Sequence, residues 1–139
     1  MVPFWVYAVV GFVALVVVVN AWIRVRIRRI AASRPGENFD TFHSSFAADD
    51  IPAEILHAVY AEFQKSCSGA VAAFPVRAAD DIGRIYGMVD EDLEYAVSEV
   101  VEELGRQFPP DEMLRKMQPA ITVRDFVLFV VACPKMVNL

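Results

Sequence analysis

Three groups of residues have types and spacings that could carry chemistry, and the first is Glu54 with His57. Their Glu-x-x-His spacing matches one half of a helical di-metal site, in which both side chains ligate the ions from one helix turn. Such a site also needs a second pair of this kind and further glutamates on facing helices. The only other histidine is His43. We therefore interpret Glu54 and His57 as ordinary helix residues and predict no metal site.

The second group is formed by the only two cysteines, Cys67 and Cys133. Both fall at ends of predicted helices, where cysteine usually serves as a small buried hydrophobic residue. A cysteine–histidine nucleophile would need an orienting group and an oxyanion site, and neither can be identified. The sequence also lacks a glycine-rich phosphate loop, a serine–histidine–aspartate set and zinc-type cysteine spacing. We predict no catalytic residue, no cofactor and no enzymatic activity.

The third group is an acidic run. Seven acidic residues and no basic residue lie between Asp90 and Glu103. Such a run either forms a solvated face or acts as an electrostatic docking surface for a basic partner protein, and both interpretations stay open. As a docking surface, its partner-binding residues would be Asp90, Glu91, Asp92, Glu94, Glu99, Glu102 and Glu103.

The chain that must position these groups has 139 residues, which predicts one small domain or two at most. Its apolar fraction of 56% is too high for a disordered protein. Residues 1–30 contain four arginines and no acid, whereas residues 31–139 contain nine basic and 18 acidic side chains. This acidic excess argues against nucleic acid as a partner.

The apolar residues concentrate in Phe4–Ile23, a stretch of 20 positions without one charge. About 20 apolar residues are enough for a helix to cross the roughly 30 Å hydrocarbon core of a bilayer. Trp5 and Tyr7 near one end and Trp22 near the other match the aromatic belts at the two membrane interfaces. We therefore predict a single transmembrane helix whose first partner is the lipid bilayer.

Arg24, Arg26, Arg28 and Arg29 follow this segment directly, and no basic residue precedes it. The positive-inside rule then places the N-terminus outside the cell membrane and the domain behind this arginine collar in the cytoplasm. The alternative, a cleaved signal peptide, would need a basic start and a small-residue site directly after its apolar core. The small residues Ala31–Ser33 come only after the collar, which disfavours that alternative.

Residues 31–50 contain polar and helix-breaking residues without a clear period, which is typical of a linker. Phe39, Phe42 and Phe46 stand about one helical turn apart within this segment. They predict either a loop with scattered anchors, which we favour, or a short helix docked on the domain or on the membrane surface.

Helical spacing of apolar residues runs through 51–139, which we predict to form one all-helical domain. The clearest helix carries an apolar stripe from Leu93 to Leu104. Acidic residues crowd its first turn, where the helix dipole favours negative charge. The predicted helices are 51–67, 82–86, 90–104, a short one after Pro109 and Pro110 with Met113 and Met117, and 123–133.

Capping residues mark several of these boundaries. Short polar side chains accept hydrogen bonds from the first free N–H groups of a helix, and glycine ends helices through its left-handed conformation. The predicted signals are Asp50 with Pro52 before the first helix, Asp80 and Asp81 before the short one with Gly87 after it, and Thr122 with Asp125 before the last.

This order of elements resembles the acyl carrier protein family over roughly residues 51–133. The resemblance rests on a first helix followed by a long loop that ends in the stretch 74–87, and on an acidic second helix that opens with Asp90-Glu-Asp-Leu. Pro109-Pro-Asp-Glu then leads into a short helix, and Ile121-Thr-Val-Arg-Asp-Phe opens the last one. The resemblance implies a four-helix bundle, behind the transmembrane helix, whose acidic second helix docks onto partner proteins.

One position departs from the family pattern. Carrier proteins attach phosphopantetheine to a serine in an Asp-Ser-Leu triplet at the start of the second helix, and this chain has Glu-Asp-Leu at 91–93. Asp92 stands in the place of the serine, and a carboxylate cannot form the phosphoester that a hydroxyl forms. Ser98 lies farther inside the same helix, and Ser66 and Ser68 lie at the end of the first one. The resemblance therefore implies a carrier-like domain without the carrier's prosthetic group.

These features together predict a non-catalytic, single-pass membrane protein whose cytoplasmic domain binds other protein subunits. Contact with them is expected through a basic surface of the partner and through the transmembrane helix. The expected role is an accessory or assembly subunit of a larger membrane complex, for example a bioenergetic complex of a bacterial inner membrane. The alternative is a membrane-tethered acyl carrier protein with a phosphopantetheine arm on one of its serines.

Overall fold

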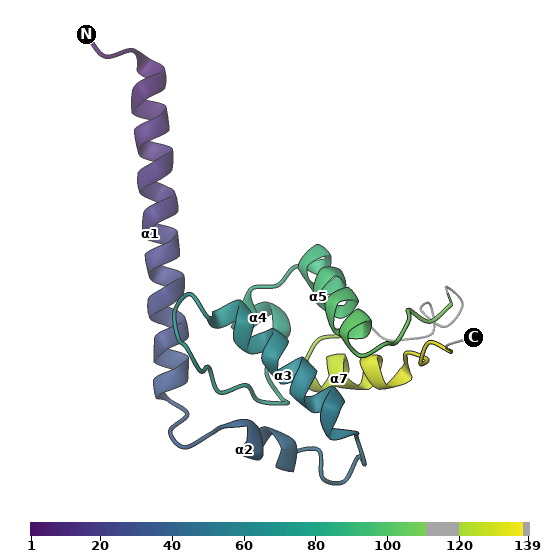
Figure 1. Ribbon diagram of the computed structural model, residues 1–139. Helices are drawn as coiled ribbons and strands as arrows, with labels where there is room; N and C mark the ends of the chain where they lie inside the picture. Colours follow the sequence, from purple (N-terminus) through teal and green to yellow (C-terminus); the bar gives the residue numbers. More distant parts are fainter. Residues whose placement is uncertain (111–119, 138–139) are drawn as a thin grey trace.

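The computed structural model describes residues 1–110 and 120–137, and every regular element in this part of the chain is a helix (Figure 1). The predicted all-helical fold class is therefore confirmed. The short helix predicted after Pro109, with Met113 and Met117, lies outside the described residues, so the four-helix bundle remains a prediction. The helices are α1 (Phe4–Ala32), α2 (Phe39–Ser44), α3 (Ala53–Cys67), α4 (Ile82–Tyr86), α5 (Asp90–Glu103) and α7 (Val123–Ala132).

Helix α1 is a straight rod of 29 residues whose N-terminal part stands clear of the other helices (Figure 1). At 1.5 Å per residue a helix of this size is roughly 44 Å long, more than the thickness of a bilayer's hydrocarbon core. None of its most apolar window is buried against the rest of the molecule. By length and composition α1 can therefore cross a membrane, as predicted for Phe4–Ile23.

Helix α3 lies at the centre of the helical domain and packs against α2, α4, α5 and α7. Its apolar residues recur every three or four positions, so one broad stripe of the helix is removed from water. Phe63 in this stripe meets Phe126 of α7 edge to face, with their ring centroids 5.1 Å apart. Among the described residues of the domain, the other large side chains that are almost fully buried are Phe42, Phe46, Phe74, Ile55, Leu56, Val59, Val76, Val100, Val123 and Val127.

The segment 31–50, predicted to be a linker, carries the short helix α2. The Asn38 side chain accepts the N–H groups of Asp40 and Thr41 and so caps this helix. Phe42 and Phe46 are each only 2% exposed and belong to the core of the domain. Of the two interpretations of the phenylalanines, the docked short helix is thus the one found, since the Phe42 ring packs against Tyr60 of α3 and against Phe46, with ring centroids 5.1 Å apart in each pair.

Local capping signals account for several helix boundaries. The Asp81 carboxylate accepts the Arg84 N–H at 2.8 Å, and Gly87 ends α4 with φ of 65°. Thr122 and Asp125 form the predicted capping box of α7. The predicted N-cap at Asp50 is wrong. Asp50 has φ of 49°, and the non-helical Pro52 takes the N-cap position, its carbonyl accepting the first helical N–H.

Candidate functional site

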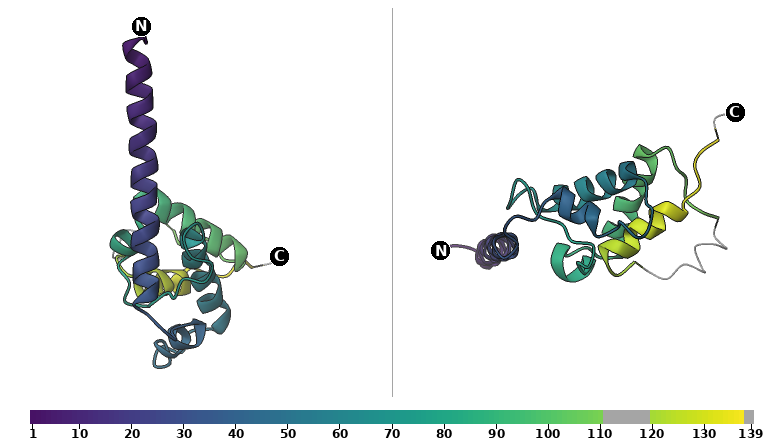
Figure 2. Two further views of the ribbon diagram at one scale, coloured as in Figure 1. Left: turned by 90° about the vertical axis from the view of Figure 1, so that its left-hand side faces the viewer. Right: turned by 90° about the horizontal axis from the view of Figure 1, so that it is seen from below.

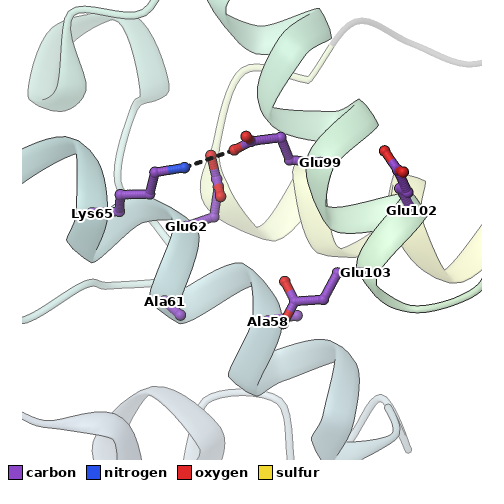
Figure 3. Close-up of a pocket in the computed structure, with 7 residues that line it drawn as sticks. All are labelled: Ala58, Ala61, Glu62, Lys65, Glu99, Glu102 and Glu103. Carbon is purple, nitrogen blue, oxygen red and sulfur yellow. Dashed lines mark hydrogen bonds and ion pairs between the residues drawn. The ribbon is translucent and has the colours of Figure 1, made fainter.

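An open cleft between α3 and α5 brings carboxylates from two helices together (Figure 3). Its volume is about 520 Å³. The lining side chains are two alanines, four glutamates and one lysine, namely Ala58, Ala61, Glu62 and Lys65 of α3 and Glu99, Glu102 and Glu103 of α5.

Lys65 forms the ion pair that joins the two walls of the cleft. Its Nζ atom lies 2.8 Å from Oε2 of Glu99, and the Tyr95 hydroxyl donates to Oε1 of the same carboxylate at 2.8 Å. These two hydrogen bonds hold the pKa of Glu99 below its usual range. The bond to Glu99 also raises the pKa of Lys65, so the pair is fully charged at neutral pH.

Glu62 lies beside this ion pair without being its direct partner (Figure 3). Partial burial raises the pKa of Glu62, and the carboxylates of Glu99 and Glu103 raise it further, against the opposing effect of Lys65. Carboxylates that crowd one another in this way are stabilised by an added cation. One lysine does not balance four glutamates, so the cleft presents an excess of negative charge that suits a lysine or arginine from another molecule.

The seven acidic residues predicted to bind a partner fall into two groups. Glu99, Glu102 and Glu103 line the cleft. The other four lie in the N-terminal half of α5, are exposed, and do not line the cleft. Of these four, Asp92 accepts the Val89 N–H at 3.2 Å and so helps to cap α5. The remaining three are Asp90, Glu91 and Glu94.

Sequence reasoning missed Glu62 and Lys65. Both lie outside the apolar stripe of α3, Lys65 exposed and Glu62 half-buried, but no local signal shows that this side faces α5. The sequence separation between Lys65 and Glu99 is 34 residues, and only the packing of the helices brings them together.

A second missed feature is the joint between α1 and the domain. The guanidinium of Arg34, just after α1, donates to both carboxylate oxygens of Asp80 at 2.6 and 2.9 Å and to the Pro75 carbonyl at 2.8 Å. The Tyr86 hydroxyl donates to the same carboxylate at 2.8 Å. Arg34 and Asp80 are 7% and 5% exposed, so this is a buried, fully hydrogen-bonded pair. Burial beside Asp80 raises the pKa of Tyr86, which stays a neutral hydrogen-bond donor.

The predicted arginine collar divides between the domain and the solvent. Arg26 donates to the Arg84 carbonyl, and Arg28 donates to the Ala70 carbonyl at 3.2 Å. Between them, Ile27 is buried against the domain at 5% exposure. Arg24 and Arg29 are exposed and form no hydrogen bond or ion pair with any residue in 1–110 or 120–137. Half of the collar therefore fastens α1 to the domain.

The Glu54 and His57 pair lies on the outer side of α3. The His57 ring stacks on Phe39 of α2, with ring centroids 3.8 Å apart and planes inclined by 15°. Glu54 is exposed. Within the described parts of the chain no group of three or more histidine, cysteine and acidic side chains is placed to hold a metal ion.

Both cysteine thiols are buried in apolar surroundings. Burial raises the pKa of Cys67 to about 11 and also raises that of Cys133. Cys133 donates its S–H to the Phe129 carbonyl at 3.3 Å. A thiol is nucleophilic as the thiolate, so at neutral pH neither side chain is activated for nucleophilic chemistry.

The three serines considered for a prosthetic group all point back onto their own helix. The hydroxyl of Ser98 donates to the Glu94 carbonyl at 2.9 Å, and those of Ser66 and Ser68 donate to the Phe63 and Lys65 carbonyls. None of these serines stands at the first turn of α5, where the carrier family has its attachment site.

Comparison with known proteins gives no relative: no family model, no curated protein and no solved structure matches the chain. The cleft and the joint are therefore the features of the molecule that bear on its function.

Proposed function

We propose that this protein is a non-catalytic, membrane-anchored subunit that binds other proteins. In this proposal α1 crosses the membrane once, and the cleft between α3 and α5 receives a basic segment of a partner protein. The observation that carries the proposal is the charge of the cleft, where four glutamates face one lysine. Partial burial and, to a smaller extent, the neighbouring carboxylates raise the pKa of Glu62, and a lysine or arginine of the partner would offset both effects.

The joint between α1 and the domain supports a docking role at the membrane. The contacts of Arg26, Arg28 and Arg34 hold the domain in one orientation on the end of α1. A flexible tether would let the cleft search a large volume, whereas this joint presents it in a fixed place beside the membrane. Such an arrangement suits an accessory or assembly subunit of a larger membrane complex, such as a bioenergetic complex of a bacterial inner membrane.

The arginine distribution supports an orientation with the N-terminus outside and the domain in the cytoplasm. Four arginines follow the apolar segment of α1 and none precedes it. The exposed sides of the membrane-crossing part of α1 remain available to other transmembrane helices of the complex.

The test is native mass spectrometry of the protein extracted gently from its own membrane. The double variant Glu102→Lys and Glu103→Lys reverses two charges of the cleft without touching the Lys65–Glu99 pair. The matched control, Asp90→Lys and Glu94→Lys, makes the same charge change on the same helix outside the cleft. We expect subunits that travel with the wild-type chain to be lost from the cleft variant and retained by the control.

Two results would contradict the proposal. Equal retention of the subunits by both variants would mean that the cleft is only a solvated surface. A wild-type chain heavier by one phosphopantetheine would instead establish the alternative, a membrane-tethered acyl carrier protein, and peptide mapping would then identify the modified serine.

A further inference from the structure

One side of α1, just beyond its apolar segment, is not covered by the domain. Seen along its axis, α1 stands at the edge of the helical domain, with the domain on one side only (Figure 2). Ile27 marks the side that faces the domain, because it is buried at 5% exposure. Arg29 follows two residues later, about 200° farther round the helix, and therefore points to the open side.

A groove runs along this open side. Its volume is about 430 Å³, and its lining residues are Ala21, Trp22, Val25, Arg26, Arg29 and Ile30. Spacings of three and four residues place Trp22, Val25 and Arg29 on one helix face. The groove is therefore apolar toward the membrane-crossing segment and basic toward its far end, and no acidic residue is among its lining residues.

The two arginines of the groove differ in what already binds them. Arg26 donates to the Arg84 carbonyl of the domain, which places it at the edge of the groove. Arg29 forms no hydrogen bond or ion pair with any residue in the described parts of the chain, and its guanidinium is exposed. Arg29 therefore keeps all five of its N–H donors for an external acceptor.

The position of the groove along α1 matches the membrane interface. The uncharged segment ends at Ile23, so a helix that spans the hydrocarbon core with this segment places residues 21–23 at the edge of the core and residues 24–30 at the level of the lipid headgroups. The exposed Trp22 ring supports this level, because tryptophan favours the interface. At this depth an acyl chain can lie along Ala21 and Val25 while a phosphate group reaches Arg29.

From this juxtaposition we infer that the groove binds one anionic phospholipid, with its phosphate on Arg29 and its upper acyl chain against Trp22 and Val25. The cytoplasmic leaflet, where this groove lies in the proposed orientation, is the leaflet richer in anionic lipid. The inference needs α1 to lie in a bilayer. It does not depend on a partner protein in the cleft between α3 and α5.

The experiment uses the full chain in a neutral detergent, with lipid retention read by native mass spectrometry. Phosphatidylglycerol and phosphatidylcholine are added separately at equal concentration. The variant Arg29→Gln is compared with Arg24→Gln, which removes one exposed arginine that does not line the groove. We expect one retained phosphatidylglycerol per wild-type chain. Retention should fall about fivefold in Arg29→Gln, as for the loss of one basic residue near an anionic surface, and less than twofold in Arg24→Gln.

Further arms separate the lipid from other occupants. Arg29→Lys keeps the charge and is expected to keep most of the retention. The water-soluble headgroup glycerophosphoglycerol should not displace the lipid, because it lacks the chain that contacts Val25. Equal losses of lipid retention in Arg29→Gln and Arg24→Gln would mean that the arginine collar attracts lipid without a specific site, which would overturn the inference. Equal retention of the two lipids, or displacement by the soluble headgroup, would also overturn it, as would a protein subunit that occupies this face in the native extract without lipid.

Discussion

The Asp80 carboxylate joins Arg34, just after α1, to Arg77 and Tyr86 near Asp80 itself, and its replacement by asparagine is expected to loosen all three contacts. It accepts two hydrogen bonds from Arg34, one from the Arg77 N–H at 2.9 Å and one from the Tyr86 hydroxyl. Asparagine offers one acceptor oxygen, and its NH₂ group would face the donors of the guanidinium. The variant therefore leaves a buried cation without its partner charge.

The burial of the pair sets the size of the effect. The Arg34 and Asp80 side chains are only 6% and 4% exposed, and removal of one partner from such a buried pair costs about 3–5 kcal/mol. The Arg124–Asp49 pair offers a contrast, because its side chains are 38% and 36% exposed. An exposed pair contributes about 0–1 kcal/mol. Asp80→Asn should therefore remove a large part of the stability of so small a domain, and Asp49→Asn should remove little.

Chemical denaturation of the full chain in a neutral detergent, followed by circular dichroism, measures the loss of unfolding free energy in Asp80→Asn and in Asp49→Asn. A double-mutant cycle with Arg34→Met gives the coupling between the partners. Because Arg34→Met removes the stranded cation, the double variant should be no less stable than Asp80→Asn alone. A loss of stability in Asp80→Asn no larger than that in Asp49→Asn would contradict a buried, coupled pair, and so would losses in Arg34→Met and Asp80→Asn that simply add.

Three further changes test the packing and the cleft. Glu62→Gln should stabilise the fold at neutral pH, because the raised pKa of Glu62 means that its ionised form opposes folding. This gain should vanish as the pH falls below about 4.5, the pKa of a glutamate in the unfolded chain. Thermal melts of the variant and the wild type at neutral pH and below this pKa measure the gain, and a variant that is less stable than the wild type at neutral pH would contradict it. Phe42→Ala should cost about 3–5 kcal/mol in a denaturation curve, since Phe42 is 2% exposed, and a cost under 1 kcal/mol would mean that α2 is only loosely docked. Val100→Asp places an unpaired charge at a fully buried position, so its circular dichroism spectrum should show loss of the domain's helices, and a native-like spectrum would contradict the packing.

The helices and their ends could be predicted because their signals are local. The apolar stripe of α5, the capping box of Thr122 with Asp125 and the left-handed Gly87 each depend on residues within a few positions of one another. The N-cap prediction at Asp50 is wrong because a short acidic side chain before a helix matches the sequence pattern of an N-cap whether or not its backbone has the conformation that an N-cap needs. Its positive φ, which the sequence does not reveal, removes it from the N-cap position.

The cleft and the joint could be predicted only in part, because they depend on contacts across long sequence separations. The acidic half of the cleft follows from the charge of α5, but the Lys65–Glu99 and Arg34–Asp80 pairs join residues 34 and 46 positions apart. Arg34 also lies in a segment whose composition is that of a linker. Its guanidinium is buried against the Pro75 carbonyl, the Asp80 carboxylate and the Phe74 ring, which belong to a distant part of the sequence.

The joint between α1 and the domain affects how readily the cleft can bind a partner. Association of two proteins costs translational and rotational freedom, and it costs less when the binding surface is already held in place. The joint contacts of Arg26, Arg28 and Arg34 restrict the domain relative to α1, and in the proposed arrangement a membrane restricts α1 itself. A partner in the same membrane would then meet the cleft at a fixed height and with few orientations to search. A rigid joint behind an acidic cleft is thus expected to favour a membrane-bound basic partner over a soluble one of equal charge.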